Sequence, residues 1–152
     1  MAKTKGKRPG NCTADDCLKL VQEAAEARKN SYCPYSGFAV GAALLASDGT
    51  IYRGCNVENA SYGATNCAER TALFSAVADG RKPGEFTAIA VVGGPKDGDP
   101  VPCPPCGICR QALAEFANPA EFTVLWVTEV VDGKPAYETH TLAELLPGAF
   151  SL

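Results

Sequence analysis

A run of almost uninterrupted apolar residues constrains the fold of this chain more than any other feature. The stretch FTAIAVVGG, residues 86–94, has the length of one strand, and a strand of this kind is buried on both faces. FTVLWVTEVV, residues 122–131, has the same character. Segments with helical spacing of apolar residues stand before and between these strands, so helices are available to cover both faces. The sequence therefore predicts an α/β fold, a three-layer α/β/α sandwich around a mixed five-stranded sheet.

The remaining elements follow from caps, turns and apolar periodicity. Thr13 is a good helix cap, and Asp15 and Asp16 favour the positive end of the helix that follows. SDGT at 47–50 is typical of a hairpin turn. The expected elements are a helix from 13 to about 29, strands at 38–46 and 51–59, a helix from 66 to 80, a strand at 86–94, a helix at about 106–117, strands at 122–131 and 137–141, and a last helical turn and tail at 142–150.

The helix at 66–80 should bury one face, formed by Ala68, Ala72, Leu73, Ala76 and Val77. We expect a single domain from 13 to 152, preceded by a flexible basic tail at 1–12.

Length and charge restrict the classes of partner. The chain has 152 residues and a net charge of −3, and its one basic cluster lies at the N-terminus. A polynucleotide-binding protein usually needs a clustered basic face, so we expect a small neutral ligand and no nucleic acid polymer. No apolar run approaches the ~20 residues that span a bilayer, and the basic start lacks the apolar segment of a signal peptide. The sequence predicts a cytoplasmic protein with no membrane partner.

Eight cysteines are many for this length. Without a secretion signal they favour metal binding or catalysis over a disulfide framework. Three are evenly spaced in PCPPCGICRQ, and the two prolines between the first and second supply no N–H groups to the sulfurs. Cys106 and Cys109 instead fall in the first turn of a helix, whose dipole favours thiolates. We interpret Cys103 as a spare loop cysteine, and Cys12, Cys17 and Cys33 as small buried residues or spare thiols.

A zinc site needs a third ligand beside Cys106 and Cys109, and usually a fourth. His140, the only histidine, falls in a predicted edge strand and is interpreted as a surface residue. Cys67 is the better candidate because it also opens a helix. Three thiolates from two helix starts, with an open fourth position, are typical of a catalytic zinc centre. The alternative is a structural site in which Cys103 or Cys55 closes the fourth position.

Two residues that follow Cys67 suit such a centre. Glu69 has capping-box spacing from Asn66 and would then only complete the helix start. Beside a metal it would instead carry protons from water to a substrate nitrogen, which is the interpretation that the neighbouring cysteines favour. Arg70 lies three residues after Cys67, hence on the same side of the helix. Its positive charge would offset the negative charge of three thiolates on one Zn²⁺. The alternative interpretation is that Arg70 is an ordinary surface arginine.

A polar pair suits the hydroxyl groups of a sugar. Asn56 and Glu58 are two residues apart in a strand-like stretch and therefore share a face. The alternative is an exposed strand end without a ligand.

Several motifs resemble one family. CAE at 67–69, followed by PCGICRQ at 105–111, resembles the cytidine deaminases, the free-nucleoside branch of the zinc deaminases. YCPYSGFAVGAAL at 32–44, GCNVENASYG at 54–63, CAERTALFSAV at 67–77 and ELLPGAF at 144–150 agree with it, so the resemblance runs from about residue 13 to the end. It implies a cytidine deaminase-like fold and one Zn²⁺ per chain. The implied reaction is hydrolysis of cytidine and deoxycytidine to uridine and deoxyuridine with release of ammonia, in pyrimidine salvage.

The resemblance also implies roles for individual residues. Zinc is held by Cys67, Cys106 and Cys109, a water activated by the metal attacks C4 of cytosine, Glu69 shuttles protons, and Arg70 lies against the thiolates. Asn56 and Glu58 bind the ribose, and the Ala68 backbone helps to hold the base. Phe38 packs on the pyrimidine ring. The alternative interpretation is that Phe38 is an ordinary residue of the hydrophobic core. Ala60, Tyr62 and Phe150 correspond to residues that neighbouring subunits lend to the site, which implies a homotetramer with shared active sites.

The alternative within this chemistry is that the chain is a related deaminase with another substrate: a nucleotide, a blasticidin-like antibiotic or a base within RNA. Asn56, Glu58 and ENASYG instead favour a free nucleoside. Pro104 stands where the family often has serine, and proline keeps the carbonyl for a backbone contact. No residue distinguishes cytidine from deoxycytidine.

Overall fold

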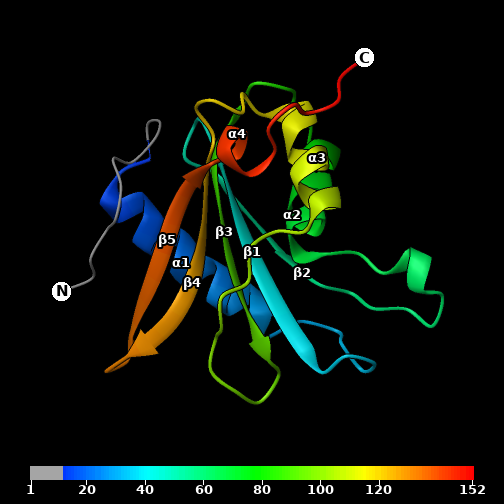
Figure 1. Cartoon of the computed structure of the whole chain (residues 1–152), viewed down its shortest axis with the longest axis vertical. Helices are drawn as coiled ribbons and strands as arrows, with labels where there is room; N and C mark the ends of the chain where they lie inside the picture. Colours follow the sequence, from blue (N-terminus) through cyan, green and yellow to red (C-terminus); the bar gives the residue numbers. More distant parts are fainter. Residues whose placement is uncertain (1–11) are drawn as a thin grey trace.

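The computed structural model describes residues 12–152 and confirms the predicted sandwich (Figure 1). Five strands form one sheet in the order β2-β1-β3-β4-β5. Only β3 and β4 run parallel, and the other pairs are antiparallel, so the sheet is mixed. In chain order the elements are α1 (Ala14–Arg28), β1 (Phe38–Ala46), β2 (Ile51–Cys55), η1 (Tyr62–Ala64), α2 (Ala68–Ala78), β3 (Phe86–Pro95), α3 (Gly107–Phe116), β4 (Thr123–Val131), β5 (Lys134–Thr141) and α4 (Leu142–Leu145).

Alternate residues of the central strands enter two separate cores. On one face, Ala43 and Leu45 of β1 pack with Leu20 of α1. On the other face, Ala42 and Leu44 belong to the core that contains buried residues of α2, α3 and α4. In Figure 1, α1 passes behind the sheet. This alternation explains why the strands are apolar on both faces.

The described structure begins one residue before the predicted helix cap. Thr13 forms a full capping box with Asp16, as its position predicted. Cys12 is already buried, with its sulfur 3.3 Å from the sulfur of Cys17. The rest of the predicted tail, residues 1–11, lies outside the described residues. Within residues 12–152, no helix has the length and apolar character needed to cross a membrane.

Two predicted strand boundaries were wrong. The strand predicted at 51–59 ends at Cys55. The reason is that the Asn56 side chain donates to the Phe38 carbonyl at 2.8 Å and accepts from the Val40 amide at 2.9 Å, so a side-chain amide bonds to the β1 backbone where the strand stops. The strand predicted at 137–141 begins earlier, at Lys134, because Asp132 and Gly133 form a tight turn with φ of 50° and 74°.

The buried face of α2 differs slightly from the predicted face. Ala68, Ala72, Leu73 and Ala76 are buried, but Val77 is 36% exposed. The buried set is instead completed by Glu69, the one charged residue in it. A helix turns by about 100° per residue, so Val77 falls at the edge of this face, whereas Glu69 falls near its middle.

Gly54 fixes the distance between α2 and β2. A Cβ atom at this position would lie 2.3 Å from the Ala68 carbonyl oxygen and 2.4 Å from the Ala72 amide nitrogen. Both are backbone atoms, which cannot move aside as a flexible side chain would. The helix therefore lies directly on the strand, and its first residues are held in place by that contact.

We expect the Gly54→Ala substitution to lower the free energy of unfolding by about 3 kcal/mol, the upper end of the range for overpacking. Gly63→Ala is the matched control, because a Cβ there meets no atom within 4 Å. Its effect should stay within about 0.5 kcal/mol. Urea unfolding of both variants measures this, and equal stabilities would contradict the close approach of α2 to β2.

Candidate metal and active site

Three cysteine sulfurs meet where two helices begin. Cys67 is the N-cap of α2 and Cys106 is the N-cap of α3, and neither sulfur caps its own helix. Cys109 lies in the first turn of α3 and is fully buried. The three sulfurs lie within 4.8 Å of one another, and they are the single group of potential metal ligands found among residues 12–152. The spacing that predicted these three residues as a set is thus matched by their geometry.

The spacing of the sulfurs fits a tetrahedral zinc ion. Zn–S bonds of about 2.3 Å place two sulfurs about 3.8 Å apart at a tetrahedral centre. The sulfurs of Cys67 and Cys106 are 3.8 Å apart. All eight cysteines lie in the described part of the chain, and none forms a disulfide.

Arg70 supplies the positive charge beside the sulfurs. Its guanidinium donates to the Cys67 sulfur at 3.4 Å. Its Nε is the one buried side-chain nitrogen or oxygen in the described residues that has no hydrogen-bond partner. An unpartnered buried donor next to three thiols fits a site built for additional negative charge. Arg70 is therefore not the ordinary surface arginine of the alternative interpretation.

The Cys67 thiol is already biased towards ionisation. A hydrogen bond with the Cys109 thiol, supported by hydrogen bonds with Arg70 and Cys106, lowers the pKa of Cys67 to about 5, although burial opposes it. The same hydrogen bond, together with burial, raises the pKa of Cys109. The two thiols titrate as a pair, whose first proton leaves well below neutral pH. A metal that binds here displaces the remaining protons.

Glu69 lies in the first turn of α2 and is only 4% exposed. Burial is the main cause that raises the pKa of its carboxyl group, and the charge of Cys67 raises it further. The alternative interpretation of Glu69, a capping box with Asn66, is wrong. The helix begins after Cys67, so Glu69 is one residue too early for that role, and the Asn66 side chain donates to the Thr71 hydroxyl at 3.1 Å instead. Glu69 is thus a buried carboxyl group beside the sulfurs, without a helix-capping function.

Asn56 and Glu58 lie beyond the end of β2 at Cys55, and Val57 between them forms isolated bridges with Tyr32 and Asn66. That the two side chains share a face stays a prediction. Asn56 is 9% exposed, and one N–H of its amide remains after its bonds to Phe38, Val40 and Ser31. The Glu58 Oε1 atom accepts from the Tyr35 and Ser36 amides at 2.9 and 3.1 Å, and hydrogen bonds from Ser36 lower its pKa. The Glu58 carboxylate is therefore held in position by these two backbone amides.

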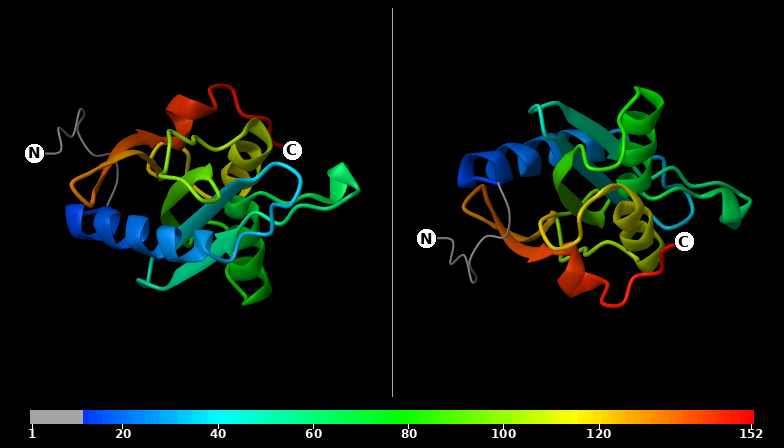
Figure 2. Two further views of the ribbon diagram at one scale, coloured as in Figure 1. Left: turned by 90° about the horizontal axis from the view of Figure 1, so that it is seen from below. Right: turned by 90° about the horizontal axis from the view of Figure 1, so that it is seen from above.

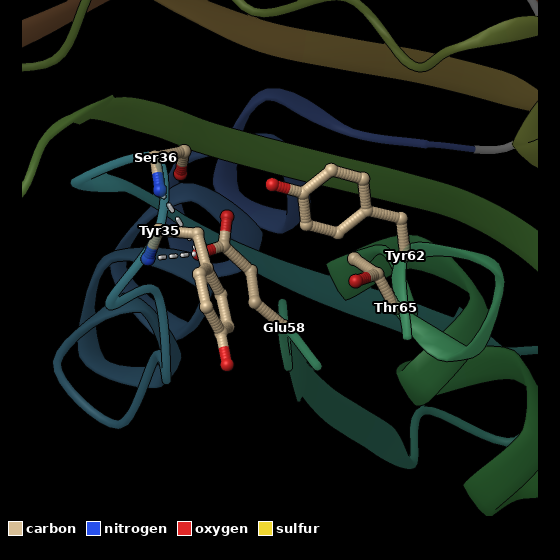
Figure 3. A pocket seen from close by; sticks show the side chains of 5 residues that line it. All are labelled: Tyr35, Ser36, Glu58, Tyr62 and Thr65. Carbon is tan, nitrogen blue, oxygen red and sulfur yellow. Dashed lines mark hydrogen bonds between the residues drawn. The ribbon is translucent and has the colours of Figure 1, made fainter. Parts of the chain in front are cut away.

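Glu58 lines a pocket with a volume of about 360 Å³, and Figure 3 shows the side chains around it. Its other lining residues are Tyr35, Ser36, Tyr62 and Thr65. The rings of Tyr35 and Tyr62 lie edge to face, with their centres 6.2 Å apart. Sequence reasoning predicted Glu58 and Tyr62 but missed the other three. The motif YCPYSG, which contains Tyr35 and Ser36, was the available signal.

Phe38 opens β1 and is half-buried, so it is not the fully buried core residue of the alternative interpretation. It meets Cys103 over Gly93 of β3: a Cβ at Gly93 would lie 2.6 Å from the Cys103 sulfur and 3.2 Å from the Phe38 ring. Burial raises the pKa of Cys103 to about 11, and the charge of Glu69 adds to this. Cys103 is thus a loop cysteine outside the cluster of three sulfurs, as predicted, and it packs against the core. Ala68 is fully buried as the first residue of α2.

The remaining predicted residues are exposed. Tyr62 is 78% exposed and Phe150 is 70% exposed, and Ala60 is also at the surface. Tyr62 belongs to η1, whose loop projects away from the body of the molecule in every view (Figures 1 and 2). The predicted surface position of His140 was only partly right, because its ring is half-buried and stacks on Trp126 with centres 4.7 Å apart.

Comparison with known proteins gives a consistent result. The family model for the cytidine and deoxycytidylate deaminase zinc-binding region matches residues 15–125. A cytidine deaminase of Sporosarcina psychrophila is 52% identical over 136 residues, which are 90% of this chain and 92% of that protein. A cytidine deaminase of Halalkalibacterium halodurans is 52% identical over 138 residues, 90% of this chain and 95% of that one. The crystal structure of cytidine deaminase from Burkholderia pseudomallei is 50% identical and superposes with a TM-score of 0.73, covering 87% of this chain and 97% of that chain.

Metal analysis of purified protein tests the thiol cluster. We expect zinc to co-purify with the chain and to be lost in the Cys109→Ser variant, because a buried hydroxyl is a much weaker zinc ligand than a thiolate. Cys103→Ser is the matched control, since Cys103 lies nearby but outside the cluster. Zinc content measured by mass spectrometry should fall in the first variant and stay unchanged in the second. Equal loss in both variants would contradict the three-cysteine site.

Proposed function

The chain belongs to the cytidine and deoxycytidylate deaminase family, and we propose that it is a zinc-dependent deaminase of cytidine and deoxycytidine, which it hydrolyses to uridine and deoxyuridine with release of ammonia. The observation that carries this proposal is the position of Glu69. A carboxyl group buried beside three metal-binding thiols is where a hydrolytic deaminase needs its proton carrier.

One Zn²⁺ per chain would be held by Cys67, Cys106 and Cys109, and it would supply the Lewis acidity that lowers the pKa of a water molecule for its attack on C4 of cytosine. Glu69 accepts a proton from this water and gives a proton to the ring nitrogen N3. It then takes the proton of the new C4 hydroxyl and passes it to the amino group, so that the C4–N bond breaks, ammonia leaves and the C4 carbonyl forms. The burial that raises the pKa of the Glu69 carboxyl suits this work, because it makes the carboxylate a stronger proton acceptor than an exposed glutamate.

The substrate contacts use groups that the fold leaves available. The spare N–H of Asn56 and the second oxygen of Glu58 suit the hydroxyl groups of the ribose. The ring of Phe38 packs against the pyrimidine, and the Ala68 backbone, at the buried start of α2, helps to hold the base. Both groups suit neutral hydroxyls, and neither supplies a positive charge for a phosphate group, so a free nucleoside is the preferred substrate class.

A structural zinc site with four thiolates is less well supported. It needs Cys103 or Cys55 as a fourth ligand, and neither belongs to the cluster of three sulfurs. Cys55 instead donates to the Asn30 carbonyl at 3.6 Å. A structural site also gives no reason for a buried carboxyl at Glu69.

Matched Glu→Gln substitutions test the roles of Glu69 and Glu58. We expect Glu69→Gln to retain zinc and to lower kcat for cytidine by about 10³-fold or more, because the amide carries no proton for transfer. Glu58→Gln should mainly raise KM, since it weakens a sugar contact away from the reacting bond. The loss of cytidine absorbance follows both. Failure of the zinc-loaded wild type to convert cytidine or deoxycytidine would overturn the function, and deoxycytidine monophosphate would then be the next substrate to test.

The same proposal includes a homotetramer with shared active sites, working in pyrimidine salvage in the cytoplasm. Exposed Ala60, Tyr62 and Phe150 support the sharing, because they lie on the projecting loop and the C-terminal segment. Eight cysteines without a disulfide support a reducing compartment. The substrate is a small molecule, and no nucleic acid polymer or membrane takes part.

Complementation between variants tests the shared sites. Glu69→Gln removes the proton carrier from a chain but leaves its Phe150 intact, and Phe150→Ala does the reverse. We expect mixed tetramers, made by co-expression, to be more active than the sum of the two separate variants. The reason is that a Phe150→Ala chain with an intact Glu69 receives Phe150 from its neighbour. Purely additive activity in a confirmed mixed oligomer would show that each chain has its own complete site.

A further inference from the structure

Two consecutive side chains of α3 bind backbone carbonyls near the end of the chain. One of them also binds the carbonyl that precedes Cys106. Arg110 donates from Nε to the Pro105 carbonyl and from Nη1 to the Leu145 carbonyl, each at 2.8 Å. Gln111 donates from Nε2 to the Phe150 carbonyl at 3.0 Å. The C-terminal segment, residues 146–152, thus lies beside α3, as Figures 1 and 2 show from different sides.

The contact with Pro105 bears directly on Cys106. Pro105 is buried and stands immediately before Cys106, so its carbonyl fixes the peptide plane from which Cys106 departs. Neither Pro104 nor Pro105 has an N–H group with which to fix this segment itself. Cys106 is an exposed N-cap without a side-chain cap bond. The guanidinium of Arg110 is consequently a restraint on the most exposed of the three metal-binding cysteines.

The second contact of Arg110 links this restraint to the C-terminal segment. Leu145 is the last residue of α4, and the chain after it has no helix or strand up to residue 152. The carbonyl of Leu145, just before this segment, and that of Phe150, within it, are bound by neighbouring side chains on one helix. The backbone at Phe150 is therefore held by its own chain while its ring stays exposed.

We propose that Arg110 and Gln111 are positioning residues that latch residues 146–152 onto α3, and that Arg110 couples this latch to the position of Cys106. The inference deepens the proposed function, because it assigns the support of a zinc ligand and of Phe150 to the same helical turn. Arg110 supports the metal site through Cys106, and Gln111 supports the substrate site through Phe150.

Neutral substitutions of similar size separate the two parts of the latch. We expect Arg110→Met to release zinc to a chelator more easily, with metal affinity lowered by about 10–100-fold, as for other residues that orient metal ligands. With Co²⁺ in place of zinc, the thiolate charge-transfer bands of this variant should shift. Gln111→Leu should leave chelator release and Co²⁺ bands unchanged while raising KM for cytidine. Both variants should accelerate amide hydrogen exchange in residues 146–152.

Two controls separate positioning from general stability. Arg81→Met removes an arginine that binds Asp48, Thr50 and Tyr52 away from the cysteines, so it should lower stability without changing zinc release. Arg110→Lys keeps one charged donor group, the ammonium, in place of the forked guanidinium, and it should release zinc at an intermediate rate. It also serves as the test protein if Arg110→Met does not fold.

Unchanged zinc release and unchanged exchange of residues 146–152 in the Arg110 variants would overturn the latch. These measurements need no substrate, so they stand apart from the proposed function. An enzyme that fails to deaminate nucleosides but loses zinc on Arg110 substitution would overturn the function and retain the latch.

Discussion

The metal site depends on two helices that begin at the same place, each with a cysteine at its first boundary. The contact between α2 and β2 is what fixes one of these starts. Gly54 allows the backbone of α2 to lie directly on the strand, and the carbonyl that it touches belongs to Ala68, the residue after Cys67. The second start is fixed by Arg110 from within α3. A change of even about 1 Å in either helix would separate sulfurs that must lie about 3.8 Å apart to share one zinc ion.

Charge is the second requirement, because three thiolates carry more negative charge than Zn²⁺ neutralises. The two helix N-termini each contribute roughly half a positive charge, and Arg70 adds a full one at 3.4 Å from Cys67. The remaining negative charge acts on Glu69, whose pKa is raised by burial and by Cys67. The arrangement that stabilises the ligands therefore also keeps Glu69 able to hold a proton. In the proposed mechanism, metal binding and proton transfer both depend on the same local electrostatics.

The sequence predicted the layers, the order of helices and strands along the chain, and the three-cysteine set, because these follow from local patterns of burial and spacing. It failed where a long-range contact decides the local structure. Asn56 ends β2 because its amide bonds to β1, a contact that no local pattern reveals. Asn66 looked like a helix cap, but the helix starts one residue later, after Cys67. Cys103 had no motif, and its position over Gly93 follows only from the path of the loop across β3.

Arg70 and Arg110 show that one residue type serves two physical purposes at one site. Arg70 touches a sulfur and acts through its charge, whereas Arg110 touches only carbonyl groups and acts through the directions of its donors. Lysine would retain the charge of either, but its single ammonium cannot reproduce a fork that reaches two carbonyls.

The hydrogen bond to Phe150 also acts by holding a group in position. A ring that is 70% exposed gains little in its own chain, so the hydrogen bond on its backbone carbonyl has value mainly if the ring is presented to a second chain. Holding the backbone beforehand removes part of the conformational entropy that association would otherwise lose.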